Sequence, residues 1–126
     1  MAPTRLVDTR VGLGSVRGRV AYEPNPFAVL PANAPVALTS LPAGPAALVV
    51  SLVAAAPTRD GWAVVDACRE PAAAIPYRTS TLNFVDGATV ANLAIVGAPA
   101  ATGEPICTFA DAPAFHIVDL VGWFTP

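Results

Sequence analysis

Short runs of apolar residues alternate with turn residues along the whole chain. No segment keeps the i, i+3, i+4, i+7 spacing of an amphipathic helix without a proline or glycine interrupting it. The runs return at intervals of roughly ten residues, which is typical of antiparallel sheet proteins. We therefore predict an all-β fold, either an antiparallel β-sandwich (jelly-roll or Ig-like) or a flattened barrel of about eight or nine short strands. The expected strands are residues 6–9, 17–22, 36–39, 47–55, 62–68, 79–85, 88–96, 106–109 and 114–124.

The strongest local signal is Asp86-Gly87, which lies between two β-prone runs and is typical of a two-residue hairpin turn. Alternation along that hairpin predicts that Asn83 and Asn92 are diagonal neighbours, about 7–8 Å apart at the backbone. One face of the predicted hairpin holds Leu82, Phe84, Ala91, Leu93 and Ile95, and the other holds Asn83, Val85, Val90 and Asn92.

Two further segments have distinct patterns. Residues 47–55 are apolar on both faces apart from Ser51, which predicts a central strand, and the turn residues 57–61 predict a second hairpin with 62–68. Prolines recur through residues 24–45, which favours loop, edge strand or covering segment, with a short strand around 36–39. Residues 69–77 and 97–105 are predicted to be a loop and a turn.

Composition narrows the class of protein. The 126 residues suffice for one domain, and 54% apolar with 13% charged residues excludes disorder despite 14 prolines. No apolar run is long enough for membrane insertion as a helix, and no signal peptide is recognisable at the start. A net charge of −2 without an arginine cluster argues against nucleic acid as a partner. We expect a single module, residues 1–126, excised from a larger protein.

Cys68 and Cys107 each lie near the end of an apolar run, 39 positions apart. A disulfide between them would contribute roughly 4 kcal/mol in the chain-entropy model. Two buried free thiols are the alternative, whereas a metal site would need spaced ligand pairs that the chain lacks. We favour the disulfide and therefore an oxidising compartment.

The inventory of reactive side chains does not favour catalysis. His116 is the only histidine, and alternation places it on the opposite strand face from Asp119, so we interpret it as a half-exposed strand residue. The remaining carboxylates are scattered, mostly at turns, and no glycine-rich phosphate loop precedes a helix. We predict no enzymatic activity, no cofactor and no metal.

Charged and amide residues within strands are the better candidates for a site. Asp8 and Arg10 share one strand face by alternation, and Arg5 lies on the other. Asp119 interrupts an apolar strand and needs a partner, either Arg5 or Arg10. Two interpretations remain: a salt-bridge and amide cluster that fixes strand register, which we favour, or a ligand site for a sugar or peptidoglycan fragment. The candidate cluster is Asp8, Arg10, Asn83, Asn92 and Asp119, with Trp62 and Tyr77 as candidate stacking aromatics.

Three stretches carry a family resemblance: PTRLVDTR at residues 3–10, LNF with TVANL at 82–93, and IVDLVGWF at 117–124. Their order and spacing resemble the β-module, often tandemly repeated, of large secreted and surface proteins of actinobacteria, with the pattern PTRLLDTR, SNLN(Y/F), TVANL, VDVxGYF. Trp123 stands where the family usually has Tyr, and Val7 where it has Leu. The family cysteines match Cys68 and Cys107. Because such modules accompany hydrolases and wall-associated domains, the resemblance implies an accessory or display role.

These observations lead to two hypotheses of different classes. The first is a non-catalytic structural or interaction module of an extracellular or cell-surface protein, including self-association. The alternative is a module that binds cell-wall polysaccharide or peptidoglycan, and a hydrolase is a distant third.

Overall fold

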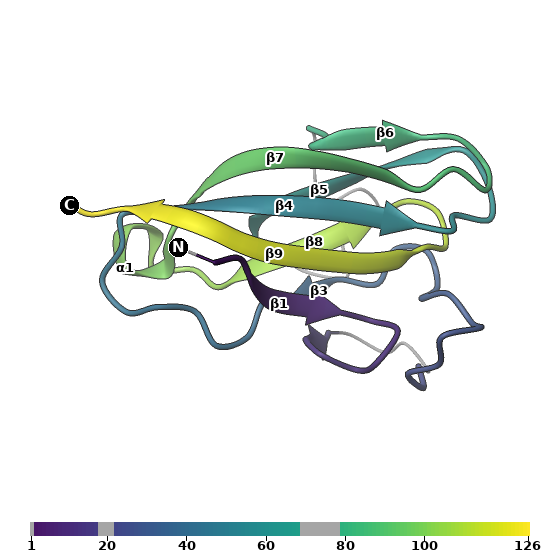
Figure 1. Cartoon of the computed structure of the whole chain (residues 1–126), viewed down its shortest axis with the longest axis horizontal. Helices are drawn as coiled ribbons and strands as arrows, with labels where there is room; N and C mark the ends of the chain where they lie inside the picture. Colours follow the sequence, from purple (N-terminus) through teal and green to yellow (C-terminus); the bar gives the residue numbers. More distant parts are fainter. Residues whose placement is uncertain (1, 18–21, 69–78) are drawn as a thin grey trace.

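The most apolar segment of the chain forms the central strand β4 (Ala47–Ala55). The computed structural model describes residues 2–17, 22–68 and 79–126 and places β4 between two partners in a four-stranded antiparallel sheet. Figure 1 shows this sheet in front of a second one, and neither closes into a barrel. The front sheet has the order β1 (Thr4–Asp8), β9 (Phe115–Phe124), β4 and β7 (Val90–Gly97). The rear sheet has the order β2 (Ser15–Val16), β3 (Val36–Ala37), β8 (Ile106–Ala110), β5 (Gly61–Ala67) and β6 (Leu82–Phe84).

The core lies between the two sheets and follows the period-2 rule. Every second residue of β4 is buried, from Leu48 to Ala54, and the residues between them are half-exposed. Opposite them, β5 and β8 contribute Val65 and Ile106. The predicted antiparallel sandwich of about nine strands, with residues 47–55 at its centre, is therefore confirmed.

Both predicted hairpins are wrong, because each connection crosses from one sheet to the other. β6 pairs with β5 in the rear sheet, while β7 pairs with β4 in the front sheet. The Asp86-Gly87 turn itself does form: the Ala88 N–H donates to the Val85 carbonyl at 3.1 Å, and Gly87 has a φ of 75°. Residues 57–60, between β4 and β5, likewise join strands of opposite sheets.

The two crossing turns are bonded to each other. The Gly87 N–H donates to the Pro57 carbonyl at 2.7 Å, and the Asp86 N–H donates to Asp60 Oδ1 at 2.9 Å. The N–H groups of the two central turn residues thus hold two corners of the sandwich together. The predicted faces change accordingly: Leu82 and Phe84 are buried in the core, whereas Ala91, Leu93 and Ile95 are exposed on the front sheet.

Other expectations fare differently. The strand around 36–39 is confirmed in shortened form as β3. The strand expected at 17–22 is not found where it can be tested, since β2 ends at Val16, and residues 18–21 lie outside the described residues. The predicted loop at 69–77 also lies outside them. The turn at 97–105 contains an unpredicted one-turn helix, α1 (Pro99–Thr102), which ends at Gly103 in the left-handed conformation.

Candidate functional site

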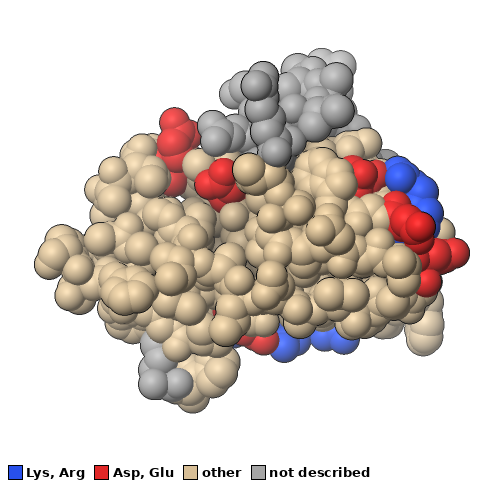
Figure 2. Space-filling model, turned by 90° about the horizontal axis from the view of Figure 1, so that it is seen from above, with Lys and Arg blue, Asp and Glu red and all other residues tan. Residues whose placement is uncertain are grey.

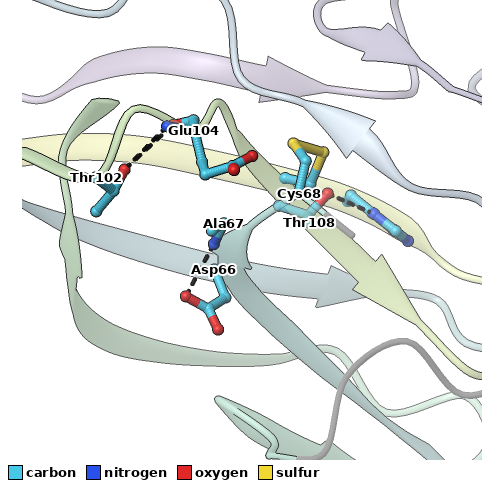
Figure 3. Close-up of a disulfide and its surroundings, with 8 residues drawn as sticks. Asp66, Ala67, Cys68, Thr102, Glu104 and Thr108 are labelled. Atoms are coloured by element: carbon cyan, nitrogen blue, oxygen red, sulfur yellow. Dashed lines mark hydrogen bonds between the residues drawn. A yellow bond between two sulfur atoms is a disulfide. The ribbon is translucent and has the colours of Figure 1, made fainter. Parts of the chain in front are cut away.

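The disulfide joins two neighbouring strands of the rear sheet. Cys68 directly follows β5, Cys107 lies in β8, and their Cα atoms are 4.8 Å apart (Figure 3). The Cys68 N–H also donates to the Pro105 carbonyl at 2.9 Å, so the ladder continues to the bridge. The predicted disulfide is confirmed, and it is consistent with an extracellular protein.

A charged cluster forms where β1 pairs with β9. It consists of Arg5, Asp8, Arg10 and Asp119, and we call it the Asp8 cluster. Arg5 Nε donates to Asp119 Oδ1 at 2.8 Å and its Nη1 donates to Asp8 at 3.1 Å. Arg10 donates to Asp8 from Nε at 2.9 Å, from Nη2 at 2.7 Å and from its backbone N–H at 3.1 Å. Asp8 is buried and bridges the two arginines.

A β-bulge explains why Arg5 belongs to this cluster. Simple alternation places Arg5 and Asp8 on opposite faces, but the register shifts between Arg5 and Val7, so that Arg5 lies opposite Asp119 and Asp8 lies opposite Ile117. The extra residue, Leu6, reverses the alternation and brings Arg5 to the face of Asp8. Of the two partners predicted for Asp119, Arg5 is the one observed, and the prediction that Arg5 faces away is wrong.

The electrostatics of the Asp8 cluster favour its charged form. The hydrogen-bonded Arg10 guanidinium holds the pKa of the Asp8 carboxyl below its usual value, although burial opposes this shift. The hydrogen bond to Asp119 raises the pKa of Arg5, and the bond to Asp8 raises the pKa of Arg10. The carboxylates are thus neutralised by side chains of the same chain.

The two asparagines lie outside this cluster. Asn83 is exposed on β6, opposite Trp62. Asn92 lies on β7, separated from β9 by β4, where its Nδ2 donates to the Thr81 carbonyl at 2.8 Å and its Oδ1 accepts the Leu93 N–H at 3.0 Å. The expectation that they are neighbours fails because β6 and β7 belong to different sheets. The predicted set of five therefore divides into a cluster of three, completed by Arg5, and two separate amides.

The candidate aromatics do not frame the cluster. Trp62 is half-buried on the rear sheet, with its ring 5.7 Å from that of Phe109 and in contact with the buried Val64. Its backbone N–H donates to Asp111 Oδ1 at 2.8 Å. Trp62 is thus a packing residue of the opposite sheet, and Tyr77 lies outside the described residues.

His116 is the polar residue that sequence reasoning placed wrongly. It is only 2% exposed and faces the core from β9, where its Nδ1 is 2.8 Å from Thr108 Oγ1 of the rear sheet. Its backbone N–H donates to Thr9 Oγ1 at 3.0 Å, whereas Nε2 has no hydrogen-bond partner within the described ranges. Burial lowers the pKa of His116 to about 4, so the ring is neutral at pH 7. The apolar neighbours on either side were the available signal for burial.

A shallow hollow of about 150 Å³ lies at the end of the sandwich where β9 finishes. Its lining is apolar and includes no residue of the Asp8 cluster: Gly44, Pro45, Ala46, Ala100, Ala101 and Pro126. In the part of the chain that the structure describes, no group of three or more His, Cys, Asp or Glu residues is arranged to hold a metal ion. None of the described helices has the length and apolar character to cross a membrane.

Comparisons of the chain with protein-family models, curated proteins and solved structures gave no match.

Proposed function

We propose that the chain is a non-catalytic structural and interaction module of an extracellular protein. One observation carries the proposal: the charged side chains that would recognise a polar ligand are bonded to one another instead. Asp8 accepts hydrogen bonds from both Arg5 and Arg10. Arg5 also donates two hydrogen bonds to the Asp119 carboxylate, from Nε at 2.8 Å and from Nη2 at 3.2 Å. Such a network joins the β1 edge to β9 and fixes the register of the bulged strand.

Two further features support this role. The disulfide adds stability of the kind that proteins in an oxidising environment outside the cell commonly use. The resemblance to repeated actinobacterial surface modules implies an accessory position in a larger protein. A spacer or assembly unit needs a stable fold and a defined surface, and no reactive group.

Ligand binding provides the test of this proposal. The purified chain is incubated with peptidoglycan, cell-wall polysaccharides and soluble oligosaccharides, and both retention and melting temperature are measured. We expect no retention and no change in melting temperature. Arg10→Gln is the diagnostic variant, because it removes the Asp8 fork while leaving the strands paired. We expect this variant to lower the melting temperature and to leave the absence of glycan retention unchanged. Saturable retention of the native chain that Arg10→Gln abolishes would contradict the proposal and favour the carbohydrate-binding alternative.

A further inference from the structure

The outer edge of β7 is a long strand edge that no described strand covers. The front sheet ends at β7, which pairs only with β4. The opposite edge is closed, because the Asp8 N–H bonds to the Leu13 carbonyl and the Leu6 carbonyl accepts the Thr39 hydroxyl. The edge strands of the rear sheet, β2 and β6, have only two and three residues, whereas β7 has eight.

The register identifies which backbone groups of β7 face outward. The Ala98 N–H bonds to the Ala46 carbonyl, so in this antiparallel register Val96, Ala94 and Asn92 share hydrogen bonds with β4. The alternate residues, Ala91, Leu93, Ile95 and Gly97, then direct N–H and C=O groups to the uncovered edge. The Leu93 N–H confirms this direction, since it bonds to the Asn92 side chain and not to β4.

The side chains along this edge carry no charge, and the two largest exposed ones are apolar. Leu93 and Ile95 are 63% and 67% exposed on the outer face of the sheet, next to Ser51 and Val49 of β4. Residues 90–97 contain neither proline nor any charged side chain, the two devices that commonly prevent edge-to-edge pairing. Figure 2, seen from the side of β6 and β7, shows a middle region of the surface without Asp, Glu, Lys or Arg.

We propose that β7 pairs antiparallel with β7 of a second copy of this chain, joining two front sheets into one continuous sheet across a two-fold axis. A second β7 pairs with this edge without like-charge repulsion, and it brings exposed Leu93 and Ile95 side chains that can cover those of the first copy. The outward N–H and C=O groups of one β7 must lie opposite those of the other β7, and only some registers allow this. The register that pairs Leu93 with Ile95 of the second copy joins the large apolar side chains and places Ala94 on the axis.

This assembly deepens the proposed structural role and rests on it. In the dimer the Leu93 N–H exchanges the Asn92 oxygen for a backbone carbonyl of the second copy. Because the interaction uses main-chain bonds along one strand, its specificity comes from the alternate outward side chains. A failure of the β7 pairing would not affect the proposed structural role, which is tested by glycan retention. The two proposals are therefore judged by separate measurements.

Sedimentation of the full chain from micromolar to millimolar concentration provides the first test. We expect a concentration-dependent dimer that Ile95→Lys weakens about tenfold or more, because each ammonium then lies opposite Leu93 of the second copy and diagonal to a like charge. Val49→Lys is the matched control, since Val49 lies opposite Ile95 on the same face but not at the edge. We expect it to keep the dimer. A monomer at every concentration, a dimer that both variants dissociate, or one that neither dissociates would overturn the proposal.

Cross-linking tests the register on an intact strand. Ala94→Cys should form a covalent dimer on oxidation, because the two introduced thiols meet at the axis. Val85→Cys is the control, as Val85 is 58% exposed and lies in the turn before β7, outside the strand. Cross-linking of both variants to the same extent, or of Val85→Cys alone, would overturn the proposed pairing.

Discussion

Along one edge of the front sheet, β1 carries charged side chains and is closed by the turn that follows it, whereas β7 at the other edge carries no charge and pairs with no described strand except β4. Asp8, buried between two arginines, holds Arg5, and Arg5 in turn bonds to Asp119 of β9. A single side chain, Asn92, bonds to an outward N–H of the second. In this sheet, the β1 edge is stabilised by side-chain bonds, whereas the β7 edge keeps backbone groups with which another strand could pair.

Acid should have the largest effect, and it should act through His116 of β9, the strand that pairs with β1. The ring of His116 is buried and bonds to Thr108 of the rear sheet. Its folded pKa of about 4 is below its ordinary value of 6.5, so the unfolded chain binds more protons between these pH values. Stability should therefore fall by about 3 kcal/mol as pH drops from 6.5 to 4. Urea unfolding at a series of pH values measures this, and His116→Leu should abolish the slope in that window. A flat native profile would contradict the neutral buried ring.

Removing the central carboxylate tests the charged edge directly. Asp8→Asn replaces the shared carboxylate with a neutral amide that has one acceptor oxygen instead of two, and it should cost about 2 kcal/mol at pH 7. Because the folded pKa of Asp8 is below its unfolded value, its contribution is present above about pH 4 and is lost as pH falls further. The difference between native and variant should thus shrink in strong acid. A constant difference down to about pH 2 would show that packing, not charge, accounts for the loss.

Asn92→Ala sharpens the comparison from the other edge and has the smallest effect on stability. It removes the bonds to Thr81 and Leu93, so the free energy of unfolding should fall by about 1 kcal/mol. The same change uncovers the Leu93 N–H and should strengthen self-association, measured by sedimentation beside the native chain. Asn83→Ala is the control, because Asn83 is an exposed amide on β6. Weaker association of Asn92→Ala would show that this amide supports the interface.

Much of the fold follows from local pattern. The strands around Val50 and Val118 and the Asp8–Arg10 pair could be predicted, because alternation, turn residues and short sequence distance determine them. The disulfide could be predicted because both cysteines lie near the ends of apolar runs. The hairpins could not be predicted correctly. Residues 90–96 are apolar on both faces apart from Asn92, so the pattern does not reveal that Leu93 and Ile95 face outward. No residue pattern indicates the bulge at Leu6. This bulge places Arg5 on the same face of β1 as Asp8, whereas simple alternation predicts the opposite face.

The position of β9 at the end of the chain also determines when the front sheet can form. β4 is hydrogen-bonded to β9, about seventy residues later in the chain, and β1 is bonded to β9 across almost the full length. During synthesis, β4 can pair early only with β7, and β1 has no partner in its sheet until residues 115–124 have been made. Such distant pairings must pay the cost of closing long loops before they gain contacts, which predicts folding in the range of milliseconds to seconds. Until β9 has been synthesised, both edges of the β4–β7 pair lack a partner strand. Incorrect pairing is therefore most frequent between nascent copies that are synthesised close together.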